Sequence, residues 1–314
     1  MGEKPQILIV CGPTASGKSA LAVALAKKLN GEVVSADSMQ IYREFSVGTA
    51  KPTIEEQRDI PHHMIDCVPP NVPFSVSDYA TRAIPIIDDI LSRGKVPVIC
   101  GGTGFYVNSL LYSLSYGNHG GDEHTLAVRK KYMDMLPVLG EEGIYAKLCE
   151  VDPVSAQKLH PNDVKRVIRA LEIYETSGIR KSDIVDDLTP RYTYLAVTPS
   201  WDREVLYNRI NQRVELMLQN GWVEEVALLQ KLGLSNEMQS MQAIGYREIA
   251  FDLANFGKLN DTTPDIIAKN TRNYAKRQIT FFKRLPNLQY LDMKKPFAEV
   301  VNSVVSSFLG KEAN

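Results

Sequence analysis

The sequence predicts an α/β protein in which helices flank a parallel β-sheet, with a helical subdomain inserted into it. Three features support this prediction. A short apolar strand leads into a glycine-rich phosphate-binding motif, strands and helices alternate over the first third of the chain, and a long helical stretch then returns to a strand. Alternating strands and helices form parallel sheets, because each crossover lays a helix against the sheet.

The first element is the apolar strand at 7–10, which runs into a sequence that fits G-x-x-x-x-G-K-[ST]. The motif consists of Gly12, Pro13, Thr14, Ala15, Ser16, Gly17, Lys18 and Ser19. Backbone N–H groups of such a loop converge on phosphate oxygens, and the helix expected over 17–29 adds its positive N-terminal end. Lys18 and the Ser19 hydroxyl reach the terminal phosphate and Mg²⁺. We therefore predict a diphosphate or nucleotide site of the kind that binds ATP, with Ser19 as metal ligand; the alternative is an ordinary glycine-rich turn.

The next elements are a strand at 32–36, a long connection, a helix near 77–92 and a strand at 96–100. Residues 37–40 and 101–104 follow these two strands, so parallel pairing brings them to the same edge of the sheet as the phosphate loop. Asp37 is then either a catalytic carboxylate or a structural acid that caps the next turn. The glycine-rich segment at 101–104 replaces the acidic residue that an NTPase uses to hold Mg²⁺, which weakens an NTPase interpretation.

After a glycine-rich stretch, a helical pattern runs from about 124 to 180, and a polar segment at 182–192 precedes a strand at 193–197. We predict a core formed by residues 1–116 and 190–314 and an inserted helical domain at 117–189. The remainder to 283 is helical by pattern, with Arg209 and Arg213 on one face, and a last helix covers 297–309.

Composition and charge narrow the class of protein. The chain has 314 residues, 44% of them hydrophobic and 23% charged, which is typical of a soluble globular protein. No early segment resembles a signal peptide and no apolar run approaches the ~20 residues that span a bilayer, so we expect a cytoplasmic protein without membrane contact. Its four cysteines show neither a disulfide framework nor the spacing of a zinc site.

The net charge is −1, yet cations cluster in two places. Arg166 and Arg169 lie three residues apart and therefore on one helix face. The stretch 269–284 carries six basic residues, no acidic one, and interleaved aromatics. Either cluster could be a solvated helix face, but two basic helices beside one phosphate site favour a large anionic acceptor, with RNA as the leading candidate.

Five segments together resemble the bacterial tRNA dimethylallyltransferase family over nearly the whole chain. They are the phosphate loop, residues 37–42 (DSMQIY), 101–104 (GGTG), 166–172 (RVIRALE) and 242–248 (QAIGYRE). The resemblance implies a P-loop kinase-like core with an inserted helical tRNA-binding domain. It also implies transfer of a dimethylallyl group from dimethylallyl diphosphate to N6 of adenosine 37, beside the anticodon of tRNA, with release of diphosphate. We expect Mg²⁺ as cofactor, the tRNA anticodon stem-loop as partner, and a monomer.

The resemblance also implies roles for individual residues. Thr14 to Ser19 hold the diphosphate with Mg²⁺, and Lys18, Thr14 and Arg213 stabilise the departing charge. Asp37 engages the adenine amine; it orients an N–H and takes the proton only as the new C–N bond makes nitrogen cationic. The expected tRNA contacts are Asp37, Ser38, Met39, Gln40, Thr103, Arg129, Lys165, Arg166, Val167, Ile168, Arg169 and Gln278.

Other classes of protein share parts of this pattern. A small-molecule or nucleoside kinase would use the same loop for ATP, and a prenyltransferase acting on free adenine nucleotides would not need the basic helices. A nucleotide-switched RNA-binding module would bind tRNA without modifying it. These three classes differ from tRNA prenylation in donor, acceptor or product, so each can be tested.

Overall fold

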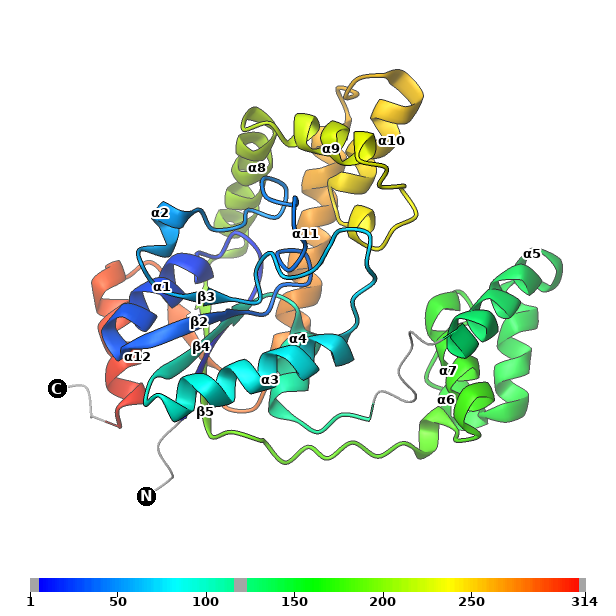
Figure 1. Ribbon diagram of the computed structural model, residues 1–314, viewed down its shortest axis with the longest axis horizontal. Coiled ribbons are helices and arrows are strands. Elements are labelled where there is room, and N and C mark those ends of the chain that lie inside the picture. The colour runs from blue at the N-terminus through cyan, green and yellow to red at the C-terminus, as the bar shows by residue number, and fades with distance from the viewer. Residues whose placement is uncertain (1–5, 116–122, 311–314) are drawn as a thin grey trace. The chain divides into compact units, whose positions relative to one another are not determined.

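The computed structural model describes residues 6–115 and 123–310. The chain divides into two compact units, one formed by Met1–Leu111 with Pro190–Asn314 and the other by Tyr112–Thr189. We call them the sheet unit and the helical unit, and describe each by itself. Both are drawn in Figure 1.

The sheet unit contains a six-stranded sheet in the order β3-β2-β4-β1-β5-β6, and its neighbouring strands pair in parallel. The strands are β1 (Ile7–Cys11), β2 (Gly31–Ser35), β3 (His62–His63), β4 (Val96–Gly101), β5 (Tyr194–Ser200) and β6 (Gln289–Asp292). The predicted α/β class is confirmed. The edge strands β3 and β6 were not expected, because neither has a run of apolar residues long enough to show a strand pattern.

Helices cover both faces of this sheet (Figure 1). The helices of the unit are α1 (Lys18–Leu29), α2 (Ile54–Gln57), α3 (Val76–Ser92), α4 (Gly104–Leu111), α8 (Arg203–Gln219), α9 (Trp222–Lys231), α10 (Tyr246–Phe256), α11 (Thr263–Phe282) and α12 (Phe297–Phe308), with a short 3₁₀ helix, η2 (Ser240–Gln242). Helix α3 begins with a capping box: Ser75 accepts a hydrogen bond from the backbone N–H of Asp78, whose carboxylate accepts from the N–H of Ser75.

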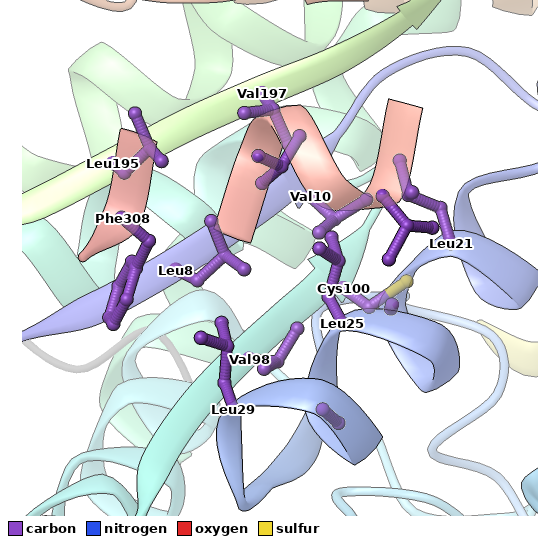
Figure 2. Packing of buried hydrophobic residues seen from close by; sticks show 14 of the residues in the cluster. Leu8, Val10, Leu21, Leu25, Leu29, Val98, Cys100, Leu195, Val197 and Phe308 are labelled. Atoms are coloured by element: carbon purple, nitrogen blue, oxygen red, sulfur yellow. The ribbon is translucent and has the colours of Figure 1, made fainter. Parts of the chain in front are cut away.

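One face of the sheet packs against α1 and α12 (Figure 2). The core there includes Leu8 and Val10 from the central strand, Leu25 from α1 and Phe308 from α12. All five residues of β1 are buried, as expected for a central strand covered on both faces. The strand that leads into the phosphate loop is therefore buried over its whole length, which gives the loop a rigid base.

The helical unit consists of α5 (Glu123–Val151), α6 (Pro153–Ala156), α7 (Val164–Ser177) and the 3₁₀ helix η1 (Lys181–Asp183). The helical stretch expected from 124 to 180 is interrupted. Gly140 has φ 67° and breaks α5, and Asp152 caps α6, which starts at Pro153. The core of this unit joins α5 to α7 through Tyr132, Leu148 and Leu171 among others.

Features of other protein classes are missing from the described ranges 6–115 and 123–310. None of their helices combines the length and apolar character needed to cross a lipid bilayer. No group of three potential acidic, histidine or cysteine metal ligands occurs there. All four cysteines are free thiols. Within these ranges His63 does not join a cluster of metal ligands: it lies 2.8 Å from the carboxylate of Glu32, which also forms ion pairs with Arg93 and Lys95.

Candidate active site

The phosphate loop joins β1 to α1, where the motif predicts it. Ala15 and Gly17 both have positive φ, at 60° and 91°. Residues in the left-handed backbone conformation curve a loop so that its successive N–H groups face one concave side. Gly12 has φ 134°, and a Cβ there would lie only 2.4 Å from Thr198 Oγ1 on β5. Glycine at position 12 is therefore required both by the backbone angle and by the neighbouring strand.

Side chains from outside the loop bind its carbonyl groups. Trp201 donates from Nε1 to Ser16 O at 2.9 Å, and Arg209 donates from Nε to Ala15 O at 2.8 Å. The Arg209 guanidinium also lies over the Trp201 ring, 4.7 Å from its centroid. Because these carbonyls are engaged on the protein side, they do not point at a bound anion. Sequence reasoning placed Arg209 on one face with Arg213 but missed Trp201; the aromatic residue directly after β5 was the available signal.

Two cations and one carboxylate lie together at the loop. Lys18 donates to Pro13 O at 3.1 Å. Burial lowers the pKa of Lys18, and Arg213 lowers it further, whereas the nearby Asp37 acts in the opposite direction. Burial likewise lowers the pKa of Arg213, which also feels the charge of Asp37. Lys18, Arg213 and Asp37 are thus close enough to interact electrostatically. The concentration of positive charge suits an anion that arrives with two or more negative charges.

Asp37 follows β2 and is half-buried. Its Oδ1 accepts hydrogen bonds from the backbone N–H groups of Met39 at 2.9 Å and Gln40 at 3.3 Å. Such a turn holds the carboxylate in a fixed orientation. Within the described residues, Oδ2 has no hydrogen-bond partner. The structural and catalytic interpretations of Asp37 are therefore compatible, since one oxygen closes the turn while the other is free.

The segments after β2 and β4 meet as the parallel topology predicts. The N–H of Ser38 donates to Thr103 Oγ1 at 3.0 Å, and the Thr103 hydroxyl donates to Ser38 Oγ at 3.2 Å. Gln40 uses its carboxamide inside the protein, donating to Thr49 O and accepting from the Ser35 hydroxyl. The expected convergence of these segments at one edge of the sheet is confirmed.

The glycines at 101–104 make room for neighbouring protein segments. A Cβ on Gly101 would lie 2.1 Å from Ala36 O, one on Gly102 would lie 2.1 Å from Gln278 Nε2, and one on Gly104 would lie 2.1 Å from the Phe281 ring. Sequence reasoning assigned these glycines to ligand approach or to a tight turn. The tight turn is confirmed, since β4 ends at Gly101 and α4 begins at Gly104. The glycines also admit the end of β2 and the side chains of α11.

Gln278 is the first correction among the expected tRNA contacts. Its side chain is only 5% exposed; Nε2 donates to Gly102 O at 3.0 Å, and Oε1 accepts from the N–H of Thr14 at 2.9 Å. A direct side-chain contact with tRNA is contradicted, because the carboxamide is buried and already bonded through both its oxygen and its nitrogen. Exposed cations lie on α11 and in the turn that follows it: Lys269, Lys276, Arg277, Lys283 and Arg284.

The helical unit brings a second correction. Lys165 and Arg166 are exposed, but Val167 and Ile168 are buried in the core at 0% and 3% exposure. Their side chains hold α7 against α5 and cannot reach an RNA.

Arg129 and Arg169 both pair with one buried carboxylate in this unit. Arg129 contacts Glu172 with N–O distances of 2.7 and 3.2 Å, and Arg169 also bonds Glu172. Glu172 is fully buried, whereas the Arg129 side chain remains 45% exposed and that of Arg169 27%. The carboxylate therefore fixes the direction of both guanidinium groups, while part of each stays open to solvent.

The residues at the loop fit Mg²⁺ only in part. Ser19 is exposed and its hydroxyl lies near the Cys100 thiol, but the described part of the chain offers no acidic cluster beside it. The end of β4, where an NTPase acid is expected, carries Cys100, and burial raises the pKa of that thiol to about 11. A Mg²⁺ ion here would be held mainly by phosphate oxygens and water, with Ser19 as its protein ligand.

Comparisons with known proteins agree with this geometry. A family model described as IPP transferase matches residues 40–285, and one described as isopentenyl transferase matches residues 5–66. The chain is 44% identical over 313 residues to a tRNA dimethylallyltransferase of Thermoanaerobacter sp. (strain X514), covering 98% of each chain. It is 42% identical to a tRNA dimethylallyltransferase 1 of Pelobacter propionicus, covering 97% of this chain and 98% of the relative.

Solved structures give the same result. A tRNA isopentenylpyrophosphate transferase from Bacillus halodurans superposes with a TM-score of 0.73 at 37% identity, covering 98% of this chain and 96% of the other. A eukaryotic dimethylallyltransferase whose structure was determined acting on tRNA superposes with a TM-score of 0.77 at 27% identity, covering 98% and 80%. The similarity therefore includes both the sheet unit and the helical unit.

Proposed function

The chain belongs to the IPP transferase family, whose members transfer a dimethylallyl group to tRNA adenosine, and from that premise we propose the donor, the acceptor atom and the residue roles. The donor is dimethylallyl diphosphate, the acceptor is N6 of adenosine 37, and diphosphate is released. The observation that carries this proposal is the free Oδ2 of Asp37, a carboxylate that interacts electrostatically with Lys18 of the phosphate loop and Arg213 of α8.

The phosphate loop binds the leaving group, diphosphate. As the bond between the allylic carbon and the diphosphate oxygen breaks, the electron pair goes to that oxygen, so negative charge grows on the diphosphate. Lys18, Arg213 and the N–H groups from Ala15 to Ser19 stabilise this charge. Mg²⁺ bound at Ser19 would neutralise part of the same charge. Preorganised donors act strongly here because the loop is already held by Trp201 and Arg209 before the donor arrives.

Asp37 acts on the acceptor. A carboxylate is too weak a base to remove a proton from a neutral aromatic amine. We therefore assign Oδ2 the task of accepting a hydrogen bond from the N6 amine, which points the nitrogen lone pair toward the allylic carbon. As the C–N bond forms, nitrogen becomes cationic and its proton passes to Oδ2.

The acceptor base has to leave its stack in the anticodon loop, which costs a few kcal/mol. Ser38, Met39 and Thr103 line the pocket beside Asp37 for the extruded base. The exposed cations of α11, together with Lys165 and Arg166, supply phosphate contacts that offset the cost. We further propose that the enzyme works as a monomer in the cytoplasm, where its tRNA substrate is found.

The test is mass spectrometry of nucleosides after unmodified tRNA has been incubated with the protein, Mg²⁺ and dimethylallyl diphosphate. We expect the mass of one dimethylallyl group on adenosine, and none on a transcript with guanosine at position 37. Transfer of label from γ-labelled ATP instead would show a kinase. Modification of free adenine nucleotides with equal efficiency would overturn the assignment of tRNA as acceptor.

A further inference from the structure

Gln278 joins two loops that lie far apart in the sequence. Its Oε1 accepts the N–H of Thr14, in the phosphate loop, and its Nε2 donates to Gly102 O, in the turn after β4. The side chain is 5% exposed, and its two bonds of 2.9 and 3.0 Å use both ends of the carboxamide. Leaving either group unpaired in this buried position would be unfavourable, because water could not replace the lost partner.

The position of this side chain is set by the packing of α11. Gln278 and Phe281 are three residues apart and so lie on the same face of the helix. A Cβ on Gly102 or Gly104 would collide with them at 2.1 Å in each case. Two glycines of the turn therefore receive two side chains of α11. The carboxamide has little freedom to move away from Thr14.

The turn that Gln278 binds also contacts the acceptor side of the site. Gly102 precedes Thr103, whose hydroxyl accepts the N–H of Ser38. Ser38 in turn follows Asp37. A chain of three hydrogen-bonded steps thus runs from the phosphate loop through Gln278 and Thr103 to the segment that carries Asp37.

We propose that Gln278 is a positioning residue that sets the phosphate loop at a fixed distance from the Asp37 segment; this assignment to donor and acceptor rests on the proposed function. The two loops hold the partners of one bond-forming step, so an error of about 1 Å between them lowers the rate steeply. The side chain of Gln278 contacts neither donor nor tRNA. The helix that carries it also carries exposed cations, which places RNA binding and site alignment on one element.

The test uses two variants of the full-length protein. Gln278→Met keeps the length of the side chain and removes both hydrogen bonds. We expect kcat for dimethylallyl transfer to fall on the order of tenfold. Titration with inorganic diphosphate and Mg²⁺ should show a several-fold weaker Kd, and the KM for tRNA should stay within about twofold. Thermal unfolding identifies any loss of the fold itself.

Gln278→Glu gives a pH profile that a merely structural role would not produce. At pH 8 the ionised carboxylate can accept from Thr14 but repels Gly102 O, so kcat should fall further than in Gln278→Met. Burial raises the pKa of such a carboxyl, and the protonated form can again donate to Gly102 O. Relative to the wild type at each pH, the variant should therefore recover activity as the pH falls toward 6.

The matched control is Gln239→Glu. Gln239 makes the same kind of two-way bond, accepting from Phe74 N and donating to Phe74 O, and it has no contact with the phosphate loop. It should show no such pH-dependent recovery.

Three outcomes separate the possibilities. Wild-type kcat and diphosphate affinity in a folded Gln278→Met would overturn the proposal. A raised KM for tRNA with unchanged kcat and diphosphate affinity would also overturn it, because it indicates a direct RNA contact. Failure of the proposed function would be seen separately, as absence of prenylated adenosine with the wild type. The diphosphate titration would still show whether the two hydrogen bonds of Gln278 position the phosphate loop.

Discussion

Replacing Asp37 by Asn separates the two tasks of this carboxylate. In the structure Oδ1 accepts from Met39 N at 2.9 Å and Gln40 N at 3.3 Å, and an amide oxygen can accept the same two bonds. The turn should therefore survive. The other oxygen, Oδ2, becomes an NH₂ group, which can neither accept a bond from the N6 amine nor take its proton. Asp37→Asn thus removes the chemistry and preserves the geometry.

The expected loss follows from that single change. General-base assistance is worth about 10²–10⁴ in rate, or about 3–5 kcal/mol of activation free energy. We expect single-turnover transfer to slow by that factor. Donor affinity should not fall, since Asp37 lies near Lys18 and Arg213 and its removal leaves their charge less compensated. Asp37→Ala should be slower still, because it also opens the turn.

The assay follows prenylated adenosine in a single turnover with enzyme in excess over tRNA, next to a calorimetric titration with diphosphate. Asp89→Asn is the control, since this exposed carboxylate of α3 pairs with Arg93, away from the loop. A rate for Asp37→Asn within threefold of the wild type would refute the assignment of the proton to Oδ2. A large loss of diphosphate affinity would refute the assignment of Asp37 to the acceptor.

Three further predictions concern the donor, the acceptor and the stability of the helical unit. Lys18→Ala should weaken diphosphate binding at least tenfold in the calorimetric titration, because it removes a cation that bonds to the loop itself; equal affinity would contradict this. Charge reversal of the exposed Lys276 and Arg277 should raise the KM for tRNA at least tenfold and flatten its salt dependence, leaving the diphosphate titration unchanged. Burial alone would raise the pKa of Asp152, but hydrogen bonds from Ser155 and from Ser182 outweigh it and lower the pKa to about 2 from 3.8. Because the pKa of Asp152 is lower in the folded state, the ionised carboxylate stabilises the fold above about pH 4, and this stabilisation is lost as the pH falls from about 4 to 2. In urea unfolding, Asp152→Asn should therefore lower the free energy of unfolding by about 2 kcal/mol at pH 7, and by less at pH 3.

Local sequence patterns predicted much of the fold because they coincide with strong physical signals. The buried strand β1 and the phosphate loop are specified by a few adjacent residues, and α12 by its apolar spacing. The edge strands could not be found in this way. Strand β3 has only two residues, and three of the four residues of β6 are exposed, so neither carries the alternation that marks a strand.

The same distinction between local and distant contacts applies to the candidate site. Motifs located Lys18 and Asp37, since their chemistry is tied to neighbours in sequence. They could not show that Trp201 and Gln278 bind the loop, because those contacts join residues 185 and 264 positions apart. A basic run likewise predicts which helix faces an RNA, but not which of its members is turned inward to the core.

The order of elements along the chain bears on how the protein is made. The core of the sheet unit extends from Leu8 to Phe308, and β1 gains its second neighbour, β5, only after the whole helical unit has been synthesised. The buried hydrophobic cluster that joins α5 to α7 in the helical unit is formed by residues between Val128 and Leu171. Local contacts form faster than distant ones, and domains fold as units during synthesis. On the ribosome, therefore, the helical unit has its complete core while β1 still exposes an unpaired edge, and the phosphate loop acquires its rigid base last.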